Sequence, residues 1–290
     1  MTYLNSQECA TTDSPFYDPA FPPEHFPTHF MSGGSPVQAF MWLAPGEGAK
    51  GCAIFVPQLY GGDSLESLIT PLLAAGIHVM KFYPRGMWDS RDYSMTGAVD
   101  DVHSAVASLR QNDGEHQTLE GRTYRIDPER IAVIGKCGGG VQGWAAAAEN
   151  PHLKAVVAVA PGNMELGRGG AAHVEDGPSS EDMLARVTAS TAGRIDIAAW
   201  MKPLTPQDYD RLSLIYQAPK LVDKKLLLVG ASADRHIPLE TNHRPIAEAQ
   251  RRAGATDFTE VILEGDTFFL TARIALARLT IDWLRSTCDF

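Results

Sequence analysis

The chain has 290 residues, of which 44% are hydrophobic and 21% charged, and its formal net charge is −10 at pH 7. This composition is typical of one α/β domain, alone or with an insertion, and the acidic balance argues against nucleic acid as a partner because phosphate binding requires a basic face. No apolar run approaches the roughly 18 residues of a membrane helix and no signal peptide opens the chain, so we expect a cytoplasmic protein with no membrane partner.

Residues 1–26 are rich in proline and aromatic side chains and are expected to form an irregular N-terminal arm that cannot be a regular helix. Alternating residues at 28–31 and 37–43, joined by a glycine-containing turn, predict a β-hairpin. From residue 51, buried apolar strands alternate with helices, which predicts a mostly parallel sheet covered on both faces. Strands are expected at 51–56, 78–83, 131–134, 155–160, 225–230 and 259–263, and helices at 65–75, 97–109, 240–254 and 270–284, with a further helix directly after residue 137.

The alternation of strands and helices stops at 162–220. A glycine-rich stretch there precedes helical segments expected around 180–189, 195–201 and 205–214, and an insertion of this size between core strands is most simply a helical cap over the site. A dimerisation element is the alternative, so a homodimer stays open. We therefore divide the chain into an arm (1–26), a core (27–161 and 221–290) and a cap (162–220).

The most informative stretch is a β-branched run that ends at Gly135, followed by Cys137 and an alanine-rich helical segment. The spacing Gly-x-Cys-x-Gly, completed by Gly139, resembles the nucleophile elbow of the α/β-hydrolase family with cysteine in place of serine. The resemblance implies a strained backbone at Cys137, with glycines where a side chain would clash. The helix that begins there is expected to favour the thiolate through its free N–H groups and its dipole. The alternative is a glycine-rich turn with an incidental buried cysteine.

The resemblance to the α/β-hydrolase family extends from about residue 28 over nearly the whole remaining chain. The apolar run at 226–230, its loop and Asp234 look like the family's acid strand, which implies Asp234 as the triad acid; taken alone, Asp234 would be a turn or N-cap residue. Thr267 stands where the family's histidine is expected, after the last strand. Because threonine cannot act as a base near neutral pH, turnover is expected to be badly impaired. An engineered variant, a natural homologue without hydrolysis, and a triad rebuilt with His236 all remain open.

The same resemblance implies an oxyanion site. One donor is expected at the backbone N–H of Gly138 and the other at Leu59, because Pro57 has no N–H. The side chain of Gln58 is a further candidate at this site. The acyl pocket is expected to be lined by Tyr60, Trp88 and Trp200, for which ordinary core or lid packing is the alternative.

Neither a cofactor nor a metal is indicated. The glycines at 138–140 match no nucleotide-binding motif, the histidines show no metal-ligand spacing, and the four cysteines are too scattered for a disulfide framework or a zinc site. The leading hypothesis is a hydrolase or acyltransferase that acts on a small-molecule ester, thioester or lactone through a thioester on Cys137, as in dienelactone hydrolases and bile-acid amino-acid acyltransferases. The alternative is a non-hydrolytic relative that binds a small molecule, or catalyses cyclisation or elimination, without an acyl-enzyme.

Overall fold

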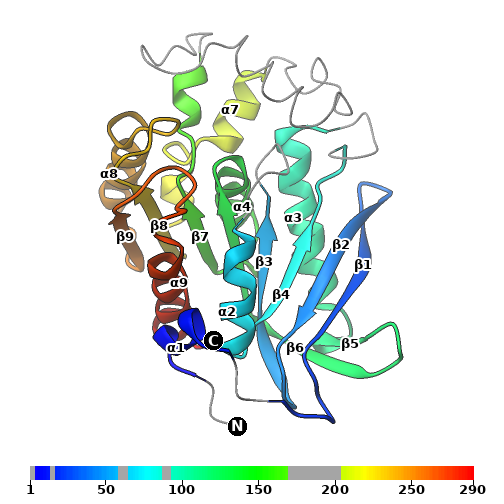
Figure 1. The fold of residues 1–290 in the computed structure, drawn as a ribbon. Coiled ribbons are helices and arrows are strands. Elements are labelled where there is room, and N and C mark those ends of the chain that lie inside the picture. Colours follow the sequence, from blue (N-terminus) through cyan, green and yellow to red (C-terminus); the bar gives the residue numbers. More distant parts are fainter. Residues whose placement is uncertain (1–3, 14–16, 58–64, 87–92, 169–203) are drawn as a thin grey trace.

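One mixed sheet runs through the part of the chain that the computed structural model describes, residues 4–13, 17–57, 65–86, 93–168 and 204–290. Its strands are β1 (Glu24–Ser32), β2 (Ser35–Leu43), β3 (Ala49–Val56), β4 (His78–Phe82), β5 (Glu115–Gln117), β6 (Thr123–Lys136), β7 (Ala155–Val159), β8 (Lys225–Ala231) and β9 (Phe258–Leu263). They lie in the order β1-β2-β4-β3-β6-β7-β8-β9, and β5 pairs with β6 (Figure 1). All the predicted core strands are therefore confirmed.

The predicted hairpin is confirmed as β1 and β2, which pair in continuous antiparallel register from Glu24 opposite Leu43 to Ser32 opposite Ser35. Gly33 and Gly34 form the two-residue turn, with φ values of 55° and 82° that glycine adopts without a side-chain clash. β2 then pairs antiparallel with β4, and β4, β3, β6, β7, β8 and β9 pair in parallel. The hairpin thus extends one edge of a parallel sheet.

Helices cover both faces of this sheet, as expected. They are α1 (Ser6–Thr11), α2 (Ile69–Ala74), α3 (Met95–Leu109), α4 (Gly138–Glu149), α7 (Pro206–Leu212), α8 (Arg244–Ala253) and α9 (Arg273–Cys288). Short 3₁₀ turns lie at Glu66–Leu68, Gln111–Gly114, Met164–Gly167 and Ala218–Lys220, and a π turn at Leu239–His243 precedes α8.

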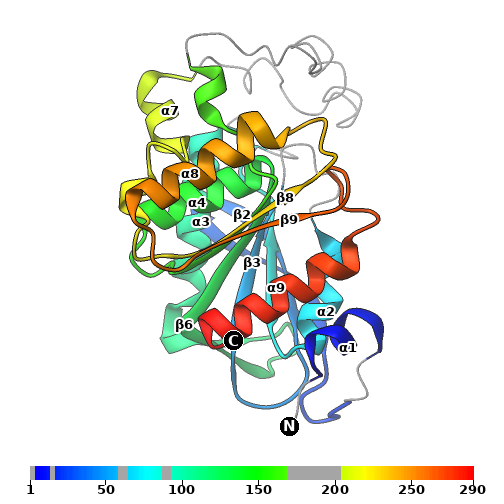
Figure 2. The same ribbon diagram turned by 90° about the vertical axis from the view of Figure 1, so that its left-hand side faces the viewer.

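The two faces of the sheet bury two separate apolar cores. Alternate residues of β6 point to opposite sides: Ile131 and Val133 pack with α3, α4 and α8, whereas Ala132 and Ile134 pack with α2 and α9. Figure 2 shows these two groups of helices on opposite sides of the strands. Because both faces are covered, the central strands β3, β4, β7 and β8 are buried almost throughout, whereas β1 and β2 at the edge alternate between buried and exposed residues.

The N-terminal arm contains a helix, so the expectation that it holds none is wrong. α1 begins with a capping box in which Asn5 accepts a hydrogen bond from the Glu8 backbone and the Glu8 side chain accepts one from the Asn5 backbone. Cys9 is buried against the α9 side of the core, and Arg285 of α9 donates to the carbonyl of Leu4. The prolines that argue against a helix all lie after this segment.

The predicted cap is described only in part. The helix expected at 205–214 is confirmed as α7, whose Arg211 forms ion pairs with Asp100 of α3 and Glu149 of α4. The helices expected at 180–189 and 195–201 lie outside the described residues. The division into arm, core and cap stays a prediction.

Candidate active site

Cys137 occupies the sharp turn between β6 and α4. Its backbone has φ 50° and ψ −119°, a conformation that a residue with a side chain rarely adopts. Its N–H donates to the carbonyl of Val159 in the neighbouring strand at 2.9 Å, and its carbonyl accepts from Val141 in the first turn of α4. The strand and the helix therefore fix the strained residue from both sides.

Two glycines allow the chain to turn this tightly. A Cβ on Gly135 would lie 2.3 Å from the backbone carbonyl carbon and oxygen of Gly139. A Cβ on Gly139 would lie 2.1 Å from the carbonyl oxygen of Val56, the last residue of β3. Both distances are far below van der Waals contact with backbone atoms, which have little freedom to move. The structure thus supplies a steric reason for the Gly-x-Cys-x-Gly spacing.

The surroundings of Cys137 keep the thiol protonated, contrary to the expectation of a favoured thiolate. Burial among protein atoms raises the pKa of the Cys137 thiol above its ordinary value, and the charge of Asp234 acts in the same direction. The Gly138 N–H and the Lys136 ammonium lower that pKa, as expected at a helix start, but burial outweighs them. The residue as a whole is only partly buried.

Asp234 and Thr267 meet beside the ends of two adjacent parallel strands. Ala231, the last residue of β8, lies in register with Leu263, the last residue of β9, so the loops after both strands leave the same edge of the sheet. Further backbone hydrogen bonds tie these loops together, including one from Ala233 to Gly265 at 2.9 Å. The Thr267 hydroxyl consequently donates a hydrogen bond to Oδ1 of Asp234, and both side chains are buried.

The carboxylate of Asp234 is held firmly on one oxygen. Oδ1 also accepts the backbone N–H groups of His236 and Ile237, each at 2.8 Å. The other oxygen, Oδ2, is buried and has no hydrogen-bond partner among the described residues. Thr267 therefore makes the contact with the acid that a triad histidine would make, but offers no ring nitrogen to a nucleophile.

His236 does not join this pair through its ring. The imidazole is exposed and packs edge-on against Phe268 with 6.0 Å between ring centroids. Among the described residues, no hydrogen bond links the ring to Cys137 or to the carboxylate of Asp234. A triad rebuilt with His236 gains no support from this placement.

Sequence analysis missed two residues that border the site, Lys136 and Phe268. Lys136 is the last residue of β6 and is 1% exposed, and its Nζ lies 4.6 Å from the centroid of the Phe268 ring. This cation–π contact joins the residue before Cys137 to the residue after Thr267. The sequence feature that could have indicated Lys136 is a lysine at the end of an apolar strand, directly before Cys137. Its buried side chain places a positive charge close to the thiol.

The remaining predicted site residues are only partly described. Gly138 is the first residue of α4, is buried, and directs its N–H toward the sulfur of Cys137. The contact between Gly139 and Val56 also places the end of β3 against the elbow, so the loop that follows β3 begins beside it. Leu59, Gln58, Tyr60, Trp88 and Trp200 lie outside the described residues.

The described part of the chain lacks two features that other kinds of function require. No group of three or more histidine, cysteine, aspartate or glutamate side chains within it is arranged to hold a metal ion. No helix within it is both long and apolar enough to cross a membrane.

Comparison with known proteins gives a clear result for the fold alone. No family model matches the sequence, and no curated protein matches it. Among solved structures, the acylaminoacyl peptidase from Pyrococcus horikoshii is similar at a TM-score of 0.63 and 15% identity, over 91% of this chain and 41% of that one. A puromycin hydrolase is similar at a TM-score of 0.64 and 15% identity, over 95% of this chain and 40% of that one. This chain thus spans about two-fifths of either protein.

A third structure has a similar length to this chain. The alpha/beta hydrolase GrgF from Penicillium sp. sh18 is similar at a TM-score of 0.64 and 17% identity, over 92% of this chain and 100% of that one. Together with the strand order and the turn at Cys137, these similarities show that the chain has the α/β-hydrolase fold. The predicted fold class is confirmed.

Proposed function

We propose that this protein is an acyl-transfer enzyme of the hydrolase type, which forms a thioester on Cys137 with a small ester, thioester or lactone. The observation that carries the proposal is the backbone of Cys137, held at φ 50° and ψ −119° at the start of α4. A strained conformation of this kind costs about 1–3 kcal/mol and persists where a function requires it. In the α/β-hydrolase fold, this turn presents the nucleophile.

In the proposed step, Sγ of Cys137 attacks the carbonyl carbon of the substrate. The thiol proton leaves to water, a carbon–sulfur bond forms, and the negative charge that develops on the carbonyl oxygen is stabilised by the N–H of Gly138. The bond to the leaving alcohol or thiol then breaks, and the leaving group takes up a proton. Attack by water or an amine on the thioester completes hydrolysis or transfer.

The raised pKa of Cys137 and the hydroxyl of Thr267 both make this cycle slow. A protonated thiol is a weak nucleophile, and among the described residues no imidazole is hydrogen-bonded to the sulfur or to the carboxylate of Asp234 to remove its proton. Deacylation suffers more than acylation because water needs a base to attack the thioester, whereas a thiol can lose its proton to solvent. The protein is therefore proposed to acylate slowly and to release the acyl group more slowly still.

The experiment compares turnover of an activated thioester by the unmodified chain, by Thr267→His and by Thr267→Gln. Histidine can donate one ring N–H to Asp234 and act as a base through its other ring nitrogen, so turnover is expected to rise about 10²–10⁴-fold. Glutamine is of similar size without a usable base and should give no gain. Cys137→Ala in the Thr267→His background should abolish the gain. A Thr267→His protein that folds normally, as judged by its melting temperature, and gains no turnover with any substrate of a broad panel would overturn the proposal.

A further inference from the structure

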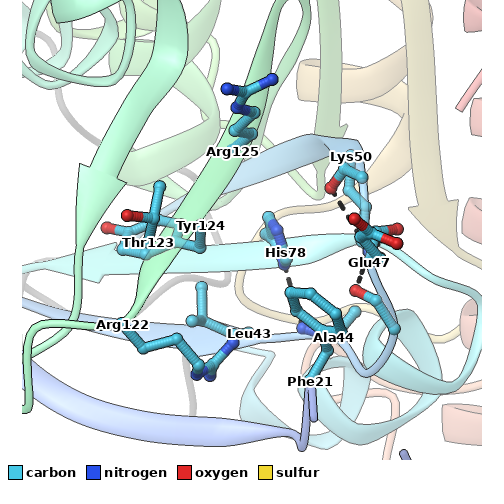
Figure 3. A pocket seen from close by; sticks show the side chains of 12 residues that line it. Phe21, Leu43, Ala44, Glu47, Lys50, His78, Arg122, Thr123, Tyr124 and Arg125 are labelled. Carbon is cyan, nitrogen blue, oxygen red and sulfur yellow. Dashed lines mark hydrogen bonds between the residues drawn. The ribbon is translucent and has the colours of Figure 1, made fainter.

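A cavity lies at the opposite end of the sheet from Cys137. It has a volume of about 290 Å³ and is formed where β2 ends and where β3, β4 and β6 begin. The site described above lies beyond the other ends of β3 and β6. Figure 3 shows the side chains that line this cavity. Small-molecule sites start at about this size, so the cavity is large enough for a ligand of benzoate size.

His78 supplies a hydrogen-bond donor with a fixed tautomer. The backbone N–H of Ala44 donates to Nδ1 at 3.0 Å, so Nδ1 carries a lone pair. Burial, reinforced by the positive charge of Lys50, lowers the pKa of His78 to about 3, and the ring is neutral at pH 7. A neutral imidazole that accepts at Nδ1 must carry its proton on Nε2.

That Nε2–H group has no hydrogen-bond partner of normal geometry within the described chain, although His78 is only 2% exposed. The backbone of Arg125 lies close enough to the imidazole to raise the pKa of His78 as a weak acceptor. It does not, however, form a hydrogen bond of normal geometry with Nε2. A buried donor without an acceptor is unfavourable. The cavity next to it therefore suits a ligand that brings an acceptor.

Lys50 supplies a positive charge beside this donor. Lys50 is 5% exposed, and its ammonium donates to the carbonyls of Gly46, Glu47 and Gly48 in the loop between β2 and β3. Among the described residues, no carboxylate forms an ion pair with Lys50; Asp18 and the exposed Glu47 carboxylate act on it only at longer range. Backbone carbonyls solvate the charge without neutralising it.

Arg122 adds a second cation on the other side of the cavity. It uses Nη2 for Glu24 at 2.5 Å and for the carbonyl of Pro22, while Nε and Nη1 make no hydrogen bond within the described chain. Arg125, which is exposed, pairs with Glu115 at 2.8 Å. Both arginine partners lie outside the cavity lining, whereas the lining itself holds three cations and a single carboxylate.

The remaining wall is apolar and aromatic. Leu43 is buried, Phe21 and Tyr124 are half-buried, and the Tyr124 ring meets His78 edge-on with 6.1 Å between ring centroids. In Figure 3, Arg125, Lys50 and Arg122 lie on different sides of His78. The cavity thus combines one neutral donor, the positive charge of Lys50, which has no carboxylate partner among the described residues, and an apolar surface.

We propose that this cavity is a binding site for a small aromatic carboxylate, separate from the site at Cys137. The carboxylate accepts the hydrogen bond of His78 Nε2–H and lies within the field of Lys50 and Arg122. The apolar body of the ligand packs against Leu43 and Tyr124. This assignment does not depend on the function proposed for Cys137.

The test is a titration of the ¹⁵N-labelled protein with benzoate to about 10 mM, followed through the ring nitrogens of His78. These signals are assigned by their loss in His78→Gln. Benzoate is expected to shift the Nε2 signal and, at ten times its dissociation constant, to raise the melting temperature by about 3 °C. Benzamide has the same shape without the charge, and should bind at least about tenfold more weakly, as should benzoate to Arg122→Gln.

Cys137→Ala is the control for location and should bind benzoate as the unmodified chain does. The proposal is overturned if benzoate leaves the His78 Nε2 signal unchanged, if benzamide binds equally well, or if Cys137→Ala abolishes binding. The last result would place the ligand at the other end of the sheet. Failure of the acyl-transfer proposal would alter none of these outcomes, so the two proposals are tested separately.

Discussion

Replacement of Cys137 by glycine should stabilise the protein relative to replacement by alanine. Both variants lose the sulfur, but alanine keeps a Cβ at φ 50° and ψ −119°, and relief of that strain is worth about 1–3 kcal/mol. Glycine also increases the entropy of the unfolded chain, which offsets about 0.4–1 kcal/mol. The free energy of unfolding of Cys137→Gly should therefore exceed that of Cys137→Ala by about 1 kcal/mol. In an unstrained strand or helix the order would be reversed.

The assay is urea unfolding of the two variants at 25 °C, monitored by circular dichroism and by tryptophan fluorescence. Coincident transitions with equal slopes would allow the two free energies to be compared directly. The melting temperatures should differ by about 2 °C in the same sense. If Cys137→Ala is as stable as Cys137→Gly or more stable, the backbone at this position is not strained, and the structural argument for a nucleophile elbow is refuted.

Three further results are expected. Gly139→Ala should lower the free energy of unfolding by about 3 kcal/mol, because the new Cβ would meet the Val56 carbonyl. Gly162→Ala is the control, since a Cβ there has nothing within 4 Å, and it should melt near the temperature of the unmodified chain. Equal effects of the two substitutions in thermal melts would contradict the packing described at Gly139. Thr267→Val should lower the free energy of unfolding by about 1.5–3 kcal/mol, because it removes the hydroxyl that donates to Asp234. Thr267→Ser keeps a hydroxyl and should lose much less. Equal losses for the two variants in urea unfolding would exclude the hydrogen bond. Because His78 is buried as a neutral imidazole, the free energy of unfolding should fall as the pH is lowered. Its pKa of about 3 lies below the unfolded value of 6.5, so protons bind the unfolded state first and about 2 kcal/mol is lost between pH 6.5 and about pH 5. In urea unfolding, His78→Gln should not show this loss at acidic pH. If His78→Gln and the unmodified chain have the same pH dependence, His78 is not its cause.

Features that depend on local sequence were predictable. The run before Gly135, the apex at Cys137 and the helix after it follow one another without a gap, so their geometry is fixed by neighbours along the chain. The pairing of Asp234 with Thr267 was also accessible, because residues that follow adjacent parallel strands leave the sheet at the same edge.

Features that depend on tertiary surroundings were not predictable. The direction of the Cys137 pKa shift is decided by the protein atoms packed around the sulfur, and a helix start alone predicts the opposite direction. The cavity beside His78 combines four separate segments of the chain, around residues 21, 43–50, 78 and 122–125. α1 is a different case: its signal, the capping box from Asn5 to Glu8, is local, but the prolines of the following segment dominated the interpretation of the whole arm.

Thr267 has a structural effect that follows from its contact with Asp234. The Thr267 hydroxyl donates to Oδ1 of Asp234, the oxygen that also accepts two backbone N–H groups from the loop of Asp234 itself. These three hydrogen bonds hold the carboxylate in place without an imidazole. The loops after β8 and β9 are thereby held together with Asp234 beside residue 267. Under the proposed function, Thr267→His alone is consequently expected to raise turnover without remodelling of the site.

Intact-mass spectrometry after exposure to an activated thioester tests the central claim most directly. The account predicts that the unmodified chain accumulates one acyl adduct, that Cys137→Ala carries none, and that Thr267→His forms the adduct and then loses it by turnover. If neither the unmodified chain nor Thr267→His carries an adduct at any time with any activated ester or thioester, Cys137 is not an acyl-accepting nucleophile and the proposed function is wrong.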